Sequence, residues 1–195
     1  MPLERSDFPI SSFQEVASAL RRQTREKPGS PAAIESGDAL ARDHPGHRLY
    51  MLGMNQIEAG DGIEAAIPIG WRYVLTPRNA EAFLAETGER AGKHRFSFFS
   101  SGDHARMLIR VWDSVKHHPI LTTGDYELRG LRIPALLVEA FWLKDRHGDR
   151  DVIVPIMAGN KSVLEKDMYS RVEFLDQLRK LLPKRLRFAR RRALH

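Results

Sequence analysis

The stretch "ALLVEAFWLKDRHGDRDVIVPIM", residues 135–157, decides the expected fold. Its first half is a nearly continuous apolar run, which is typical of a strand covered on both faces of a sheet. The polar segment "DRHGDR" has the composition of a turn, and "DVIVPIM" returns to strand character. We therefore predict a β-hairpin over this stretch, which favours antiparallel pairing over a doubly wound parallel sheet.

Segments before and after this hairpin alternate between strand and helix patterns. Further strands are expected at residues 47–54, 71–76, 93–101 and 126–134. The last of these is predicted to be bulged or at an edge, because it holds Gly130 and Pro134. Helices are expected at residues 79–89, with Asn79 as N-cap, at 102–119 and at 170–182. The mixture predicts an α+β fold with a mixed, mainly antiparallel sheet and helices packed on one face.

The chain is predicted to divide into three parts. Residues 1–46 form an N-terminal arm, with a helix at 11–22 that begins at a Ser12–Glu15 capping box, followed by a linker rich in proline and glycine. Residues 47–183 form a single α+β domain. Residues 184–195 form a basic tail, which Pro183 separates from the last helix. The apolar stripe of the arm needs a partner surface, either on its own domain or on a second subunit of a homo-oligomer.

The net charge of +6 is concentrated in the tail. Of the 31 lysines and arginines, six lie in residues 184–195, which hold no acidic residue, so 25 basic residues face 25 acidic ones in the rest of the chain. The high isoelectric point therefore indicates one charged segment and says nothing about a basic face on the folded body.

Composition also excludes several classes of protein. Without cysteine, the chain has no disulfide framework, thiolate zinc site or cysteine nucleophile. The N-terminus lacks the apolar run of a signal peptide, and no run approaches the length of a membrane span, so a cytoplasmic location is expected. The patterns of a P-loop, a dinucleotide fold and a nucleophile elbow are missing, so we expect no cofactor.

Three stretches together resemble a family of uncharacterised bacterial proteins. They are "LGMNQIEAGDGIEAAIPIGWRYVL", "GDYELRGLRIPALLVEAFWLKD", and "DVIVPI" with the later "EFLDQL". The resemblance covers about residues 47–182 and implies that the middle of the chain folds as one domain. It implies no activity, ligand or catalytic residue.

The segment "FSFFSSGDHARML" is the first candidate site, because a strand there runs into a helix N-terminus. Free amides and the helix dipole at such a point bind anions, and side chains could add further donors. The candidate anion-binding residues are Ser101, Gly102, His104 and Arg106. The alternative is ordinary helix capping by Ser101 or Asp103, whose carboxylate would also repel an anion.

Histidines on the same helix raise the question of a metal ion. His104 and His118 stand too far apart to share an ion, while Asp113 and His117 are spaced to contribute together. Two ligands do not make a metal site, so none is predicted. The histidine pair before Pro119 suits the C-terminus of a helix, where a cationic side chain meets the dipole favourably.

Glu139 interrupts the apolar run of the predicted central strand. A carboxylate buried there would need a cationic partner or a raised pKa, and either would mark a candidate functional cleft. Candidate partners are Arg72, Arg110 and Arg129, and a general base at this position would act near Tyr73 or His94. The alternatives are a structural ion pair or exposure on an incompletely covered sheet.

Three hypotheses of function follow. The first is a non-enzymatic, cytoplasmic binding or interaction module, and we favour it because no catalytic constellation is evident. The second is association with nucleic acid, or with an acidic protein, through the tail; its contacts would be Lys184, Arg185, Arg187, Arg190, Arg191 and Arg192. The third is an enzyme with a cleft near residues 100–104 and Glu139.

Overall fold

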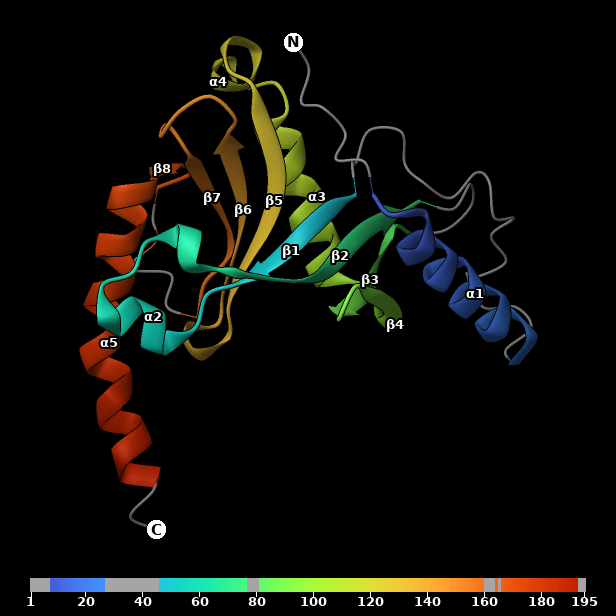
Figure 1. Cartoon of the computed structure of the whole chain (residues 1–195), viewed down its shortest axis with the longest axis horizontal. Coiled ribbons are helices and arrows are strands. Elements are labelled where there is room, and N and C mark those ends of the chain that lie inside the picture. Colours follow the sequence, from blue (N-terminus) through green and yellow to red (C-terminus); the bar gives the residue numbers. More distant parts are fainter. Residues whose placement is uncertain (1–7, 27–45, 77–80, 160–163, 165, 193–195) are drawn as a thin grey trace. The chain divides into compact units, whose positions relative to one another are not determined.

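The computed structural model describes residues 8–26, 46–76, 81–159, 164 and 166–192 (Figure 1). Its helices are α1 (Ile10–Glu26), α2 (Met54–Ala59), α3 (Asp103–Val115), α4 (Pro119–Thr123) and α5 (Arg171–Arg192), with 3₁₀ turns η1 (Ile63–Ala65) and η2 (Pro134–Leu136). Its strands are β1 (His47–Met51), β2 (Ile67–Leu75), β3 (Phe83–Arg90), β4 (Lys93–Ser100), β5 (Tyr126–Ile133), β6 (Val138–Asp145), β7 (Val152–Met157) and β8 (Tyr169–Ser170).

The strands form one mixed, mostly antiparallel sheet in the order β4-β3-β2-β1-β5-β6-β7-β8. The predicted α+β class and sheet type are thus confirmed. None of the helices in the described part of the chain is long and apolar enough to span a membrane.

Contacts within the chain group it into two compact units. Unit 1 comprises residues 1–49 and 68–128, and unit 2 comprises residues 50–67 and 129–195. The predicted division into arm, single domain and tail stays a prediction beside this grouping. Each unit is described by itself.

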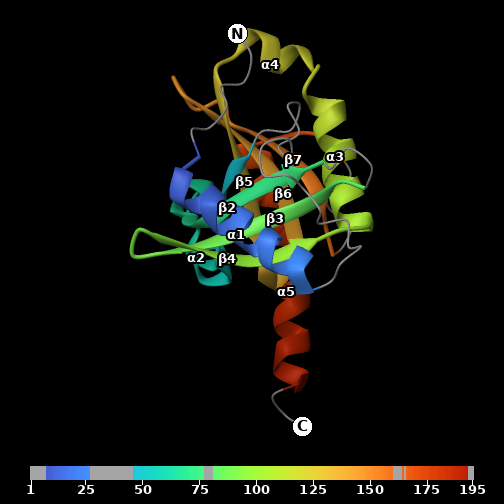
Figure 2. The ribbon, with the colours of Figure 1, turned by 90° about the vertical axis from the view of Figure 1, so that its right-hand side faces the viewer.

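Helix α1 packs on the sheet of unit 1, where it contacts β3 and β4 (Figure 2). The buried stripe of the helix includes Val16 and Leu20, and it shares a hydrophobic cluster with Trp71, Tyr73, Leu75, Phe83 and Ala85. The arm helix therefore folds onto its own sheet, one of the two alternatives that its apolar stripe left open. A homo-oligomer stays a prediction, but this stripe no longer supports it.

A buried hydroxyl chain fastens α1 to the sheet. Ser12 is fully buried, and its Oγ lies 2.8 Å from the Tyr73 hydroxyl and 2.6 Å from Thr87 Oγ1. Burial raises the pKa of Tyr73 to about 12, so this phenol stays a donor at neutral pH. The predicted Ser12–Glu15 capping box is wrong, since α1 begins at Ile10 and the Ser12 hydroxyl forms hydrogen bonds to side chains of the sheet.

Residues 83–90 form strand β3, and the helix predicted at 79–89 is wrong. Strand β3 pairs with β2 on one side and with β4 on the other, and Phe83, Leu84 and Ala85 are buried. Pairing with two neighbours outweighs the helix propensity of the alanines, leucine and glutamates in this segment. The predicted N-cap, Asn79, lies outside the described residues.

In unit 2 the predicted hairpin is confirmed, with β6 and β7 pairing antiparallel from Glu139 opposite Met157 to Leu143 opposite Val152. The first residues of the predicted strand instead belong to η2. One apolar face of the strands forms a core with α2 and α5, to which Trp142, Ile153, Phe174 and Leu178 contribute. Strand β5 lies between β1 and β6, so its predicted place at an edge is wrong.

Helix α5 begins with a capping box and continues beyond its predicted end. The Ser170 amide donates to Glu173 Oε2 at 2.9 Å, while the Glu173 amide lies 3.3 Å from Ser170 Oγ. Hydrogen bonds from Lys166 and Ser170 lower the pKa of Glu173 to about 2. The helix runs through Pro183 to Arg192, so the predicted break at Pro183 is wrong.

Candidate functional site

At the start of α3 the predicted anion-binding residues lie close together. The guanidinium group among them, that of Arg106, already pairs with acidic side chains. The N-cap is Gly102, with φ of 76°, rather than Ser101 or Asp103. Arg106 bonds Asp103 Oδ1 at 2.7 Å and Glu81 Oε1 at 2.9 Å, and this guanidinium lowers the pKa of Asp103. Ser100 Oγ lies 3.2 Å from His104 Nδ1. This arrangement offers an arriving anion a neutralised guanidinium beside an exposed carboxylate.

The histidines of this region have local structural roles. His118 is the N-cap of α4, where its Nδ1 accepts a hydrogen bond from the Ile120 amide at 3.3 Å. This ring nitrogen of His118 therefore caps the start of α4. Asp113 pairs with Lys116 at 2.8 Å. Within the described ranges, no three His, Asp or Glu side chains are placed to hold a metal ion.

Glu139 is buried, with 4% of its surface exposed, and it forms an ion pair with a cation that sequence reasoning did not name. Arg132 Nε lies 3.8 Å from Glu139 Oε2. Of the candidate partners, Arg72 bonds Glu86 at 2.7 Å, and Arg129 lies 4.8 Å from the ring centroids of Tyr50 and Trp142. The arrangement is that of a structural ion pair. The enzyme hypothesis requires Glu139 beside residues 100–104 of unit 1, and it stays a prediction.

The basic tail is helical as far as Arg192. The side chains of its six candidate contact residues lie outside the described residues.

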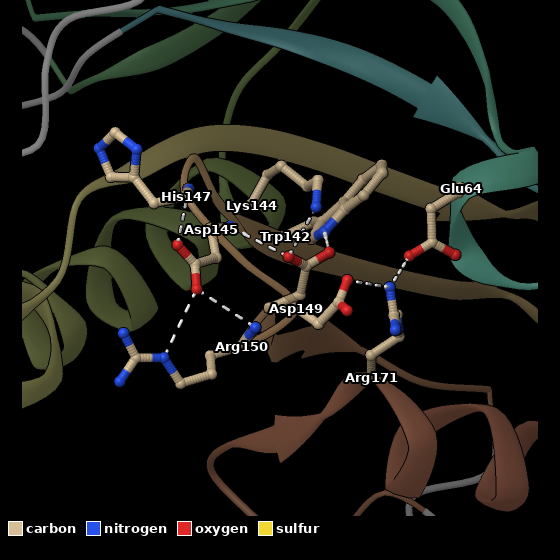
Figure 3. Close-up of polar contacts among 9 residues, drawn as sticks. Glu64, Trp142, Lys144, Asp145, His147, Asp149, Arg150 and Arg171 are labelled. Atoms are coloured by element: carbon tan, nitrogen blue, oxygen red, sulfur yellow. Dashed lines mark hydrogen bonds and ion pairs between the residues drawn. The ribbon is translucent and has the colours of Figure 1, made fainter.

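A polar network closes the β6–β7 turn in unit 2 (Figure 3). The buried carboxylate of Asp151 accepts hydrogen bonds from the Trp142 indole at 2.8 Å, from Lys144 Nζ at 3.0 Å and from the Asp145 amide at 3.0 Å. The amide of His147 donates to Asp145 and is the main cause of its lowered pKa. Protein groups thus satisfy both carboxylates, which identifies this cluster as the fastening of a turn rather than a binding site.

The remaining candidate is a groove between α1 and β4 in unit 1. Its volume is about 930 Å³. One wall is the polar side of α1, where helical spacing brings together Ser11, Gln14, Glu15, Ser18, Arg21 and Arg22. The other wall is the start of β4, residues 92–96. Since β4 is the last strand in the sheet order, the groove follows the free edge of the sheet.

The charge of this groove is positive and largely uncompensated. Among the described residues, no acidic side chain forms an ion pair with Arg22, Arg90, Lys93 or Arg95. Of the two nearby carboxylates, only Glu89 is in an ion pair among the described residues, and Glu15 contributes a negative charge to the groove lining. Glu15 Oε2 accepts the Phe96 amide hydrogen at 3.3 Å, and Glu89 pairs with Arg48 at 3.0 Å.

Strand register places like charges side by side. Arg90 lies directly opposite Lys93 across the β3–β4 pair. Like charges in this position destabilise an antiparallel pair. A second hollow of about 600 Å³ shares Lys93, Arg95 and Phe96 with the groove and adds Arg90 to its lining. The cations therefore border two adjoining hollows, and an anion bound there would relieve their repulsion.

Sequence reasoning missed this site. The neutral balance of residues 1–183 gave no indication of a basic face, although a neutral sum is compatible with a local cluster. A signal was present in "RAGKHRF", residues 90–96, where three cations flank a two-residue turn. Both turn residues have positive φ, 50° at Ala91 and 72° at Gly92, as in the tight turns that join hairpin strands.

No protein-family model matches this chain, and no curated protein or solved structure shows significant similarity to it.

Proposed function

We propose that the protein is a binding module whose unit 1 takes up a polyanion along the groove between α1 and β4. The observation that carries the proposal is the cluster of Arg22, Arg90, Lys93 and Arg95, cations without acidic partners among the described residues. Repulsion between like charges held close together raises the free energy of the protein, and a bound anion offsets this repulsion.

The lining of the groove favours a charged polymer over a small molecule. Pockets for small ligands are mostly apolar, with a few polar groups that fix orientation. Here the side chains are polar or charged, with Phe96 the exception. The groove is also open along the sheet edge, so its cations can act in a row on successive charges of a chain.

A binding measurement with inorganic polyphosphate tests this proposal, since that probe carries charge but no base or side chain. The charge-removal variant is Lys93→Gln with Arg95→Gln. Its matched control is Arg110→Gln with Lys180→Gln, two exposed cations on α3 and α5. All proteins are compared at several salt concentrations by fluorescence anisotropy.

The tail requires a separate arm, because its cations would bind the same probe. In that arm all variants are repeated in the full-length chain with its six tail cations replaced by glutamine. We expect the groove variant to bind at least five-fold more weakly than the control variant in both backgrounds. Equal affinity of groove and control variants in the tail-neutral background would overturn the proposal.

A second candidate is association through the tail, favoured by the continuity of α5 through Pro183. A continuous helix would present the tail cations on a defined scaffold instead of a free chain end. Complete loss of binding on neutralising the tail alone, with no effect of the groove variant, would support this candidate against the first.

A further inference from the structure

Strand β4 interleaves cations with aromatic rings in "KHRFSFF", residues 93–99. Directly opposite residues of an antiparallel pair share one face of the sheet, so the register assigns each side chain to a face. Phe96 lies opposite Thr87, whose hydroxyl bonds Ser12 of α1, so Phe96 faces the helix. Phe98 lies opposite Glu86, which bonds Arg72, on the other face.

On each face of β4, an aromatic ring thus lies near cationic side chains. On the helix side, His94 and Phe96 line the groove with Arg21 and Arg22. His94 Nδ1 is buried and has no hydrogen-bond partner among the described residues. On the opposite side, Phe98 is 37% exposed, so part of its side chain is accessible to a ligand. It follows Lys93 and Arg95 along that face, on the other side of the β-bulge.

We infer that the polyanion is a single-stranded nucleic acid, with its phosphates on Lys93 and Arg95 and an unpaired base on Phe98, three side chains that the register places on one face of β4. The inference rests on the proposed function and names its partner class. Single strands are held in such sites by cations along the backbone and aromatic side chains under the bases. A duplex would satisfy the cations but keep its bases paired and away from the ring.

An acidic peptide is the competing occupant, and the edge of β4 suits it poorly. A peptide would add as a strand through main-chain hydrogen bonds to outward-facing amides. The Phe96 amide is one of these, and Glu15 already occupies it. In an antiparallel ladder outward amides alternate along a strand, so His94 is the next one available before the turn. A peptide would also leave the exposed ring of Phe98 unused.

The test compares four probes on the tail-neutral full-length chain: an unstructured deoxythymidine oligonucleotide, a duplex of equal length, polyphosphate and polyglutamate. We expect the single strand to bind most tightly. Lys93→Gln with Arg95→Gln should make its log-log salt slope shallower by about 1.4, since each phosphate contact on a single strand contributes about 0.7.

Substitutions at Phe98 provide a measurement that does not depend on charge alone. Phe98→Ala should weaken single-strand binding by roughly five-fold or more, as loss of a stacked base does, while polyphosphate binding stays unchanged. Val172→Ala, at another exposed apolar side chain, is the matched control. Phe98→Trp should retain affinity, and its fluorescence should be quenched by the oligonucleotide, because Trp71, Trp112 and Trp142 are buried.

The outcomes separate the two proposals. If polyphosphate binds in the groove but Phe98→Ala leaves single-strand affinity unchanged, the nucleic-acid inference is wrong and the polyanion site stands. Tighter binding of polyglutamate than of the oligonucleotide would replace the inference with an acidic peptide partner. Failure of all four probes to distinguish the groove variant from its control would remove both proposals.

Discussion

The hairpins β3–β4 and β6–β7 are built on the same pairing and differ in almost everything else. In β6 each residue except Lys144 is buried, whereas in β4 no residue is buried. Asp145 and Asp151 fasten the turn of β6–β7, while the β3–β4 turn consists of Ala91 and Gly92, both with positive φ. One hairpin is a scaffold with the carboxylates of its turn satisfied, and the other is a surface.

The difference between the hairpins shows where the chain tolerates locally unfavourable interactions. At β6–β7 the hydrogen bonds and apolar contacts all favour the same structure. At β3–β4, Arg90 faces Lys93 across the strands and Phe98 is exposed to water. Departures from local consistency are expected at functional sites, and this hairpin concentrates two of them.

Breaking the scaffold hairpin should give the largest loss of stability. Asp151→Ala removes one carboxylate that accepts from an indole, an ammonium group and a backbone amide. Because the donors of Trp142 and Asp145 would stay buried without this acceptor, we expect a loss of about 3 kcal/mol or more in the free energy of unfolding. Urea denaturation followed by tryptophan fluorescence measures it.

Asp149→Ala is the matched control, since that aspartate lies in the same turn and its side chain is 86% exposed. Its free energy of unfolding should change by no more than about 0.5 kcal/mol. Equal losses in the two variants would show that the network around Asp151 does not stabilise the hairpin.

The surface hairpin should be more sensitive to the loss of α1 than to changes in its own side chains. Ser12→Ala removes the hydroxyl that links α1 to Tyr73 and Thr87, and it should cost about 1 to 3 kcal/mol. Hydrogen exchange in α1 and along β4 should accelerate, and polyphosphate affinity should fall because α1 forms one wall of the groove.

Ser11→Ala, the exposed neighbour on α1, is the control and should leave exchange in α1 unchanged. Unaltered protection of α1 in the Ser12→Ala protein would contradict the role assigned to the hydroxyl chain.

The same two hairpins show how far sequence alone could predict the fold. Residues 135–157 were predictable because their apolar run, polar turn and second run are all local signals. Strand β3 was not predictable in this way, since "AEAFLAETGE" is rich in helix formers and becomes a strand only through pairing with β2 and β4.

Capping patterns show the same limit. The Ser-x-x-Glu spacing occurs at Ser12, Ser162 and Ser170, and the second of these lies outside the described residues. Of the other two, only Ser170 forms a capping box. At Ser12 the two side chains bond the sheet instead. The groove forms because α1 lies beside β4, which is far from it in the sequence. Only the cations of the groove could therefore have been identified from the sequence. The buried Arg72–Glu86 pair likewise requires the β2–β3 register.

Acidification should reveal a further difference between the β6–β7 and β3–β4 turns. We expect this effect on stability to be the smallest of those predicted. The amides of His147 and Arg150 hold the pKa of Asp145 below its ordinary value of 3.8. A carboxyl whose pKa is lowered by folding stabilises the protein fully above the ordinary pKa, and this contribution is lost as the pH falls through the lowered value. The β3–β4 turn, Ala91–Gly92, contains no carboxylate and lacks this response.

Thermal unfolding of the protein and of Asp145→Asn between pH 7 and pH 2 isolates this contribution. The amide cannot titrate, so the difference between the two melting temperatures should be constant above about pH 5 and should shrink below about pH 4. Subtraction removes the acid response of Asp103 and Glu173, whose pKa values are also lowered. Parallel curves down to pH 2 would mean that the two backbone amides do not hold the Asp145 carboxylate. The β6–β7 turn would then depend on Asp151 alone.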